Sequence, residues 1–191
     1  MAKNLIVNFD DVLFRESGTV PRPGSVRLMK DAEAAHWNIA LTSTLDQRVV
    51  RERLSEFLPS LAEHVMIVGS DSWGQGESPV EIASANLRSM PEQTLVLERD
   101  IPGYERAVAA DLAMVVMMDS LPMSADIEHA RLVVDRFGLP DDEDPVAVWA
   151  DPLNLRPHPM VTVEHLEACL PAFSRKMDEL GYIKEGDVGP E

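Results

Sequence analysis

The segment NLIVNFDDVLF, residues 4–14, reads as a buried strand followed by a cluster of short polar side chains. Residues 5–7 are consecutive apolar residues, two of them β-branched, which is typical of a parallel strand covered on both faces. Open α/β sheets hold their ligands just beyond the carboxyl ends of their strands. The polar residues at the end of this strand, Asn8, Asp10 and Asp11, therefore mark a candidate ligand site.

Apolar segments of this kind alternate with segments of helical periodicity along the chain. The predicted strands are residues 5–9, 38–41, 65–68, 94–97, 113–117, 132–134 and 146–149. The predicted helices are residues 25–35, 46–57, 80–89, 103–110 and 163–180. This alternation predicts an α/β fold with a mainly parallel central sheet. Thr44 is expected to cap the second helix, and Pro171 to kink or divide the last one.

The length and composition favour a single domain. With 191 residues, 45% of them hydrophobic, the chain can form one substantial core and is short for two. We expect one domain over residues 1–191, with its core at residues 4–136. The acidic, turn-rich sequence GLPDDED then opens a C-terminal extension, residues 137–185, and the last residues, 186–191, are expected to form a flexible tail.

The charge balance limits the class of partner. Lys and Arg number 17 and Asp and Glu number 33, so the net charge is −16. Nucleic acids and anionic membranes would repel this surface, and neither is an expected partner. The single cysteine, Cys169, leaves no internal disulfide and fits a reducing compartment. No apolar run is long enough for a signal peptide or a membrane helix, so a cytoplasmic location is expected.

Residues 4–14 closely resemble the first motif of the haloacid dehalogenase (HAD) superfamily, D-x-D-G-V-L-F. Aligned on Val-Leu-Phe, the resemblance places Asn8 at the nucleophile, Asp10 at the general acid and Asp11 at the glycine. In the other register Asp10 is the nucleophile, Val12 takes the acid position, and the Val-Leu-Phe match is lost. An engineered substitution at position 8 would explain the asparagine there, but it would not explain other departures from the family motifs.

Two further segments resemble the second and third motifs of the family. IALTST, residues 39–44, is similar to the apolar strand whose terminal hydroxyl binds the transferring phosphoryl group, which implies this role for Thr42 with Ser43 beside it. VGSDSWGQGESP, residues 68–79, resembles the segment that carries the catalytic lysine. That lysine falls on Gly76, and no lysine or arginine occurs between residues 54 and 87.

TLVLERDIPGYERAVAA, residues 94–110, looks like the most specific of the family segments, a strand followed by E-D-S-x-x-G. Glu98 is kept, the aspartate that binds Mg²⁺ in relatives is Arg99, and Asp100 takes the serine position. Together with residues 130–135, the resemblance covers about residues 4–136, and the core is most similar to the β-phosphoglucomutase and phosphoglycolate phosphatase subfamily. It implies a HAD-like, Rossmannoid three-layer sandwich. Only residues 15–22 stand where relatives insert a cap domain, so no large cap is expected.

The reaction of the family needs a carboxylate that attacks phosphorus, a second carboxyl group as acid and base, and Mg²⁺ with a lysine to carry charge. A carboxamide is neutral and a very weak nucleophile. Asn8, Gly76 and Arg99 therefore predict an impaired phosphatase with a binding or regulatory role, needing no cofactor. In this function, Thr42, Ser43 and Arg99 bind a small phosphorylated ligand, with Arg99 as a fixed cation in place of the metal.

Two other functions remain open on the sequence. The first is an active phosphohydrolase with altered chemistry, in which Asp10 is the base and Glu98 and Asp100 hold Mg²⁺. The second is a structural subunit that docks on a protein partner through its acidic surface. In that case Arg99 would pair with Asp10, Asp11 or Asp100. The Trp73 loop or residues 138–160 are expected to shade the open site.

Overall fold

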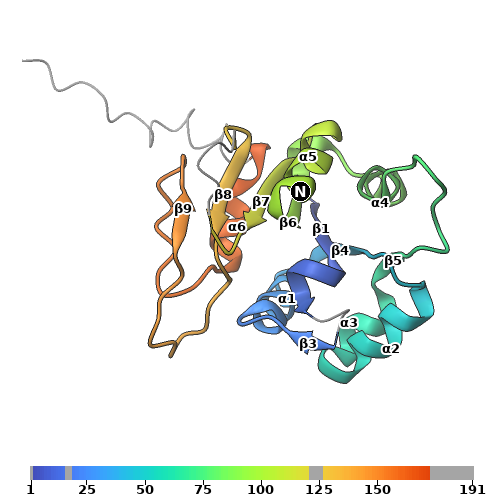
Figure 1. The fold of residues 1–191 in the computed structure, drawn as a ribbon, viewed down its shortest axis with the longest axis horizontal. Helices are drawn as coiled ribbons and strands as arrows, with labels where there is room; N and C mark the ends of the chain where they lie inside the picture. Colours follow the sequence, from blue (N-terminus) through green and yellow to red (C-terminus); the bar gives the residue numbers. More distant parts are fainter. Residues whose placement is uncertain (1, 16–18, 121–126, 173–191) are drawn as a thin grey trace, which may run out of the picture.

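The computed structural model describes residues 2–15, 19–120 and 127–172, and a seven-stranded sheet forms its centre (Figure 1). The strands lie in the order β5-β4-β1-β6-β7-β8-β9. Six strands are parallel and β9 is antiparallel to β8. Their bounds are β1 Lys3–Asn8, β4 Trp37–Thr42, β5 Met66–Val68, β6 Thr94–Arg99, β7 Ala113–Met117, β8 Ala130–Val134 and β9 Val148–Ala150. The predicted mainly parallel α/β sheet is thus confirmed.

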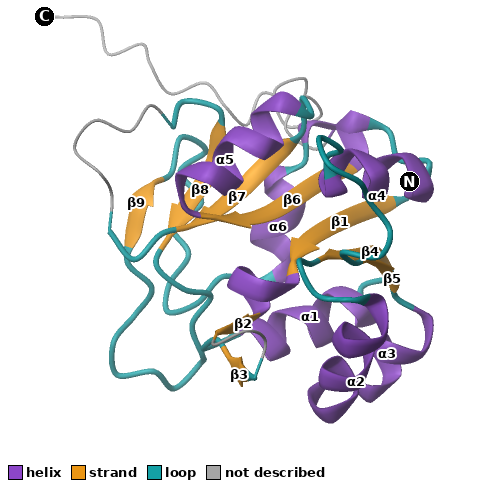
Figure 2. Ribbon diagram, turned by 45° about the vertical axis from the view of Figure 1, so that its right-hand side comes forward, coloured by secondary structure: helices purple, strands orange, loops and turns teal. Residues whose placement is uncertain are grey.

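Helices cover both faces of this sheet (Figures 1 and 2). On one face lie α1 (Ser25–Ala34), α2 (Gln47–Phe57), α3 (Pro59–His64) and α6 (Val163–Cys169), and on the other lie α4 (Pro79–Leu87) and α5 (Asp100–Ala109). Side chains alternate between the faces along β1, so Leu5 and Val7 pack in the first apolar layer and Ile6 in the second. All three are fully buried, as a strand covered on both sides requires. The architecture is the expected three-layer sandwich.

The segment between β1 and α1 is a turn and a hairpin. Residues 9–13 form the π-helical turn η1 (Phe9–Leu13), and β2 (Phe14–Arg15) pairs antiparallel with β3 (Val20–Pro21). This hairpin lies next to η1 and α1 (Figure 2). It is far too small for a cap domain, in agreement with the prediction from the sequence.

Several element boundaries differ from the predicted ones. The cap of α2 is Asp46 and not Thr44, because the Thr44 side chain contacts Asp10 instead. Helix α5 begins at Asp100, three residues before the predicted start. The short helix α3 and the 3₁₀ turn η2 (Pro91–Gln93) were not predicted, because neither is long enough to show a helical period. Helix α6 ends at Cys169, just before Pro171, and residues 173–180 of the predicted helix lie outside the described residues.

Residues 137–172 pack into the same apolar layer as the first half of the chain. Phe137, Val161 and Leu166 are buried in the cluster that contains Leu5 and Val7. The described part of the extension therefore completes the core instead of standing apart from it. The predicted tail, residues 186–191, lies outside the described residues. Within the described segments, no helix has the length and apolar character needed to cross a bilayer.

Candidate functional site

The carboxyl ends of neighbouring strands bring the predicted polar residues to one edge of the sheet. Asn8 ends β1 and Thr42 ends β4, and the two residues are partners in the parallel ladder. A cavity of about 280 Å³ opens beside them. It is lined by Asn8, Asp10, Asp11, Thr42, Ser43, Thr44, Trp73, Glu77, Pro79 and Arg106. The expected shading by the Trp73 loop is thus observed, whereas residues 138–160 take no part in this wall.

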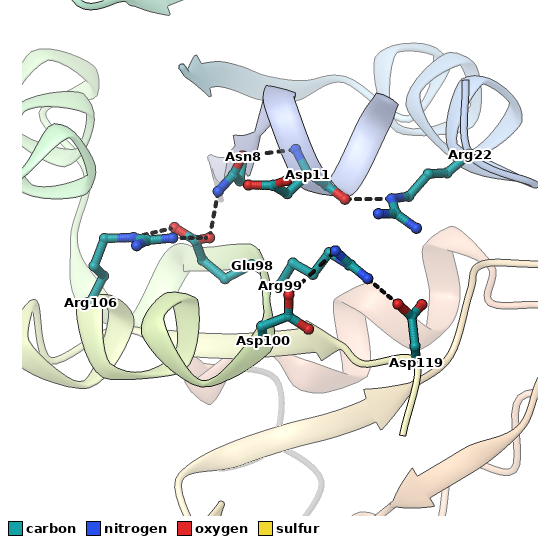
Figure 3. Close-up of polar contacts among 8 residues, drawn as sticks. All are labelled: Asn8, Asp11, Arg22, Glu98, Arg99, Asp100, Arg106 and Asp119. Carbon is teal, nitrogen blue, oxygen red and sulfur yellow. Dashed lines mark hydrogen bonds and ion pairs between the residues drawn. The ribbon is translucent and has the colours of Figure 1, made fainter. Parts of the chain in front are cut away.

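Both ends of the Asn8 carboxamide are hydrogen-bonded (Figure 3). Its Nδ2 donates to Glu98 Oε2 at 2.9 Å, and its Oδ1 accepts from the Asp11 backbone N–H at 3.2 Å. Asn8 caps the η1 turn through the second of these bonds. The Asn8 side chain is therefore a fixed, neutral part of the site wall. The Asp11 N–H is therefore already used and is not a free donor for a ligand.

Glu98 is the most deeply buried charge at the site, with 1% of its surface exposed. Its carboxylate accepts the bond from Asn8 and two more from Arg106, whose Nε and Nη2 lie 3.3 and 3.0 Å away. Arg106 stands two turns into α5, and its side chain is more than half buried. Gly103 makes this approach possible, because a Cβ there would lie 2.8 Å from Glu98 Oε2. Charge pairing thus balances the burial of Glu98.

Asp10 is bound by the loop that follows β4. Its Oδ1 accepts from Ser43 Oγ at 2.5 Å, and its Oδ2 accepts from the Thr44 N–H at 2.6 Å and from Thr44 Oγ1 at 2.7 Å. Ser43 Oγ also accepts from the Leu45 N–H at 3.0 Å. These bonds join the first and second motif segments into one rigid wall. They also leave the hydroxyl groups of Ser43 and Thr44 committed to a carboxylate.

Arg99 lies in a second, larger cavity of about 680 Å³. This cavity is lined by Asp10, Asp11, Arg15, Arg22, Thr44, Leu45, Arg99 and Asp119. The Arg99 guanidinium pairs with Asp100 at 3.3 Å and with Asp119 (Figure 3). The predicted pairing with Asp100 is observed, but Asp119 replaces Asp10 and Asp11 as the second partner. The single pocket expected for Thr42, Ser43 and Arg99 is in fact two adjoining cavities that share Asp10, Asp11 and Thr44.

The residues at the site do not fit the Mg²⁺ that the resemblance implies. Mg²⁺ prefers anionic oxygen ligands in octahedral geometry. Asn8 offers a neutral amide already in use, Glu98 is paired with Arg106, and Asp100 is half exposed and pairs with Arg99. The described residues contain no group of three or more His, Cys, Asp or Glu side chains placed to hold a metal. The predicted pair of metal ligands, Glu98 and Asp100, is therefore not assembled as a site.

Several residues that line the two cavities were not identified from the sequence, among them Arg15, Arg22, Arg106 and Asp119. Arg106 had a detectable signal, because it follows Glu98 by eight residues and so lies two turns along the next helix. Asp119 follows β7, whose carboxyl end meets that of β6. Arg15 and Arg22 had no such signal, since their position depends on the folding of the β2–β3 hairpin.

No family model matches this sequence, and neither does any curated protein sequence. Solved structures do match, among them CbbY from Rhodobacter sphaeroides, determined with phosphate and, as an Asp-to-Asn mutant, with xylulose-(1,5)bisphosphate. The identity to CbbY is 21% over 61% of this chain and 54% of CbbY, with a TM-score of 0.51. The chain thus spans about half the length of CbbY.

Two other structures extend the comparison. A haloacid dehalogenase-like hydrolase from Bacteroides fragilis is 13% identical, covering 62% of this chain and 59% of that one, with a TM-score of 0.53. A hypothetical protein from Xanthomonas campestris is 12% identical over 96% and 90% of the two chains, with a TM-score of 0.50. At these identities the likeness is one of fold. The chain has the fold of the HAD superfamily hydrolases, as its sequence motifs predict.

Proposed function

We propose that this protein binds a small phosphorylated ligand in the cavity beside Asn8 without hydrolysing it, and that its role is binding or regulation. One observation carries the proposal: the residue at the nucleophile position is a carboxamide whose two ends are bonded to Glu98 and to the Asp11 backbone. An amide in this position cannot form the acyl phosphate on which the family reaction depends. We further propose that binding requires no metal.

The contacts of Glu98 support the loss of turnover. In the proposed function its carboxylate neutralises Arg106 and holds Asn8, so it is not free to bind a metal. Replacing the nucleophile alone removes the covalent step, and the other losses act on the same catalytic unit. In the active phosphohydrolase suggested by the sequence, Glu98 and Asp100 would bind one metal ion. Each carboxylate would first have to leave its own ion pair, Glu98 with Arg106 and Asp100 with Arg99.

The donors that this cavity offers to a phosphate group are Arg106 and Thr42, and they share its wall with the carboxylates of Asp10, Asp11 and Glu77. Arg106 lines it and uses Nε and Nη2 on Glu98, which leaves Nη1 without a partner among the described residues. Thr42 lines the same wall and is buried. A guanidinium and a hydroxyl are strong donors to phosphate oxygens. Arg106, although paired with Glu98, thus keeps one guanidinium nitrogen as a donor to the ligand at a site that has no lysine.

The similar structures give a precedent for this class of ligand. CbbY was determined with phosphate, and its Asp-to-Asn mutant with a sugar bisphosphate. A protein of this fold can therefore hold a phosphorylated sugar when one aspartate is an amide. In the present chain the given sequence has an amide, Asn8, at the end of β1.

Two measurements on the purified protein test the proposal. The first is a phosphatase assay on small phosphate monoesters with Mg²⁺ and Mn²⁺, in which we expect no turnover above the blank. The second is a titration with inorganic phosphate in the presence of a chelator, followed by isothermal calorimetry or NMR shifts. We expect binding that weakens by about tenfold in Arg106→Gln, because one charge-assisted contact is lost.

Arg48→Gln is the matched control, because Arg48 is 80% exposed on α2 and contacts only Glu52. Phosphate binding should be the same in this variant as in the wild type. Turnover that disappears in Asp10→Asn would contradict the proposal and favour the active hydrolase. Absence of both turnover and phosphate binding at millimolar concentration would favour the structural subunit.

A further inference from the structure

The larger cavity gathers three arginine side chains from three separate segments. Arg15 lies in β2, Arg22 follows β3, and Arg99 ends β6. The chain as a whole carries a net charge of −16, with only 17 basic residues. Three of these line one cavity, together with three carboxylates, so the strong negative charge of the chain as a whole is balanced there. Like charges are brought together in this way at a cost that a bound anion would remove.

Only one of the three arginines has a carboxylate partner. Arg99 pairs with Asp100 and Asp119. Within the described residues, Arg15 and Arg22 have no carboxylate within 4.0 Å. Arg22 is 93% buried, and its Nε donates to the backbone carbonyl of Asp11 (Figure 3). A buried guanidinium without an ion-pair partner is costly, so its presence here needs a reason.

The electrostatics of Arg22 agree with this geometry. Burial lowers the pKa of Arg22 below its ordinary value, and the nearby charges of Arg99 and Arg15 lower it further. Asp119 and Asp11 act in the opposite direction and do not cancel these effects. The lowered pKa of Arg22 thus comes first from its burial, and the two neighbouring arginines add to it.

Carboxylates also face the cavity, and they limit where an anion could sit. Asp119 is paired with Arg99, and Asp10 accepts hydrogen bonds from Ser43 and Thr44. Asp11 is exposed, lines both cavities and lies close enough to Arg22 for its charge to act on that guanidinium. Arg15 and Arg22 are nevertheless the arginines of this cavity that have no carboxylate within 4.0 Å among the described residues, so an anion would bind there.

We propose that the cavity lined by Arg15, Arg22 and Arg99 is a second binding site, for a small ligand that carries two adjacent phosphate groups. Its volume of about 680 Å³ is that of a small-molecule pocket and exceeds what one phosphate would fill. Arg15 and Arg22, which have no carboxylate within 4.0 Å in the part of the chain that the structure describes, can each donate N–H···O bonds to a phosphate. The site does not depend on phosphate binding beside Asn8, because no arginine is common to the two cavities.

The test is a metal-free titration of the full chain with inorganic pyrophosphate, compared with inorganic phosphate and citrate. We expect pyrophosphate to bind about tenfold more tightly than phosphate at this site, since it engages a second guanidinium. Arg22→Gln and Arg15→Gln should each weaken pyrophosphate binding by about tenfold. Arg48→Gln, a remote and exposed arginine, should leave it unchanged.

Each result decides the proposal. Pyrophosphate that fails to bind at millimolar concentration, or that binds equally well to both arginine variants, overturns it. Citrate that binds as tightly as pyrophosphate overturns the diphosphate class. If Arg22→Gln loses its circular dichroism signal and is therefore unfolded, the pyrophosphate affinity of Arg15→Gln tests the proposal instead. Arg15 is exposed, so its replacement leaves the core intact. Arg106→Gln separates the two sites, since it should weaken phosphate in the smaller cavity and leave pyrophosphate here unaffected.

Discussion

Asn8 differs from aspartate by a single atom, yet that difference determines the contacts around it. As an amide, Asn8 donates to the buried carboxylate of Glu98. An aspartate there would place a second carboxylate oxygen at about the same 2.9 Å distance. Arg106 already balances Glu98, and its one charge cannot balance two carboxylates. The amide is therefore suited to this surrounding, and not merely a lost catalytic group.

This leads to a prediction for Asn8→Asp. We expect the variant to lose about 2 kcal/mol of unfolding free energy near neutral pH, because a buried hydrogen bond becomes a like-charge contact. The introduced carboxyl should have a raised pKa in the folded state. Stability should therefore be closest to wild type near the unfolded pKa of about 4, and should fall as the pH rises.

Urea unfolding of Asn8→Asp and wild type at several pH values would measure the effect. Asn86→Asp is the matched control, because Asn86 is exposed on α4 and gains the same charge. If Asn8→Asp were as stable as wild type at high pH, the Asn8 bond to Glu98 could not be a determinant of this site.

Helices α5 and α6 each hold a polar contact within their first two turns. In α5, Gly103 allows the helix to approach Glu98, and Arg106 then reaches back to the same carboxylate. In α6, the Thr162 N–H donates to His165 Nδ1 at 2.9 Å, which forms a capping box. The second arrangement requires that His165 Nδ1 carries no proton.

The capping box predicts a pH dependence that His165 alone controls. Burial lowers the pKa of His165 from its ordinary 6.5, and Glu164 and Asp151 oppose this shift. A group with a lowered pKa in the folded protein contributes stability above its unfolded pKa and loses it as the pH falls. We therefore expect the midpoint of thermal unfolding to decline as the pH falls from 6.5.

In His165→Gln this acid-dependent loss should be reduced, because glutamine can accept the same bond at any pH. Thermal unfolding at pH values above and below 6.5 measures it. His129→Gln is the control, because His129 is exposed and its side chain takes no part in a cap. An equal slope in wild type and His165→Gln would assign the acid sensitivity to other groups.

The whole molecule depends on its C-terminal extension for a complete core. Leu166 of α6 is fully buried in the same apolar layer as Val7 of β1 and Leu54 of α2. Lys3 pairs with Glu167, which ties the start of the chain to this helix. One continuous layer of this kind should unfold as one cooperative unit.

We therefore predict a single unfolding transition in urea, coincident by tryptophan fluorescence and circular dichroism. Leu166→Ala should destabilise the protein by about 2–5 kcal/mol and shift the whole transition. Leu139→Ala, at a position 39% exposed, should have little effect. Two separate transitions, of which Leu166→Ala moves only one, would show that the extension is a domain of its own.

The periodicity of apolar residues was enough to predict the α/β class and most strands, and the resemblance to the HAD family added the absence of a large cap. Local sequence carries this information because burial on both faces of a strand requires consecutive apolar residues. Motif spacing likewise predicted that Asn8, Asp10, Thr42 and Ser43 come together, since parallel strands end at one edge. That an amide stands where the family motif has its nucleophilic carboxylate could also be read directly from residue 8.

The partners of each charge could not be predicted in this way. Arg99 was expected beside Thr42, but it lies in a separate cavity and pairs with Asp119. Arg106 reaches Glu98, and Arg22 becomes buried next to Asp11, only when the helix and the hairpin have packed. These contacts join residues distant in the chain, and their geometry depends on the packing of whole elements and on the rotamers that packing permits.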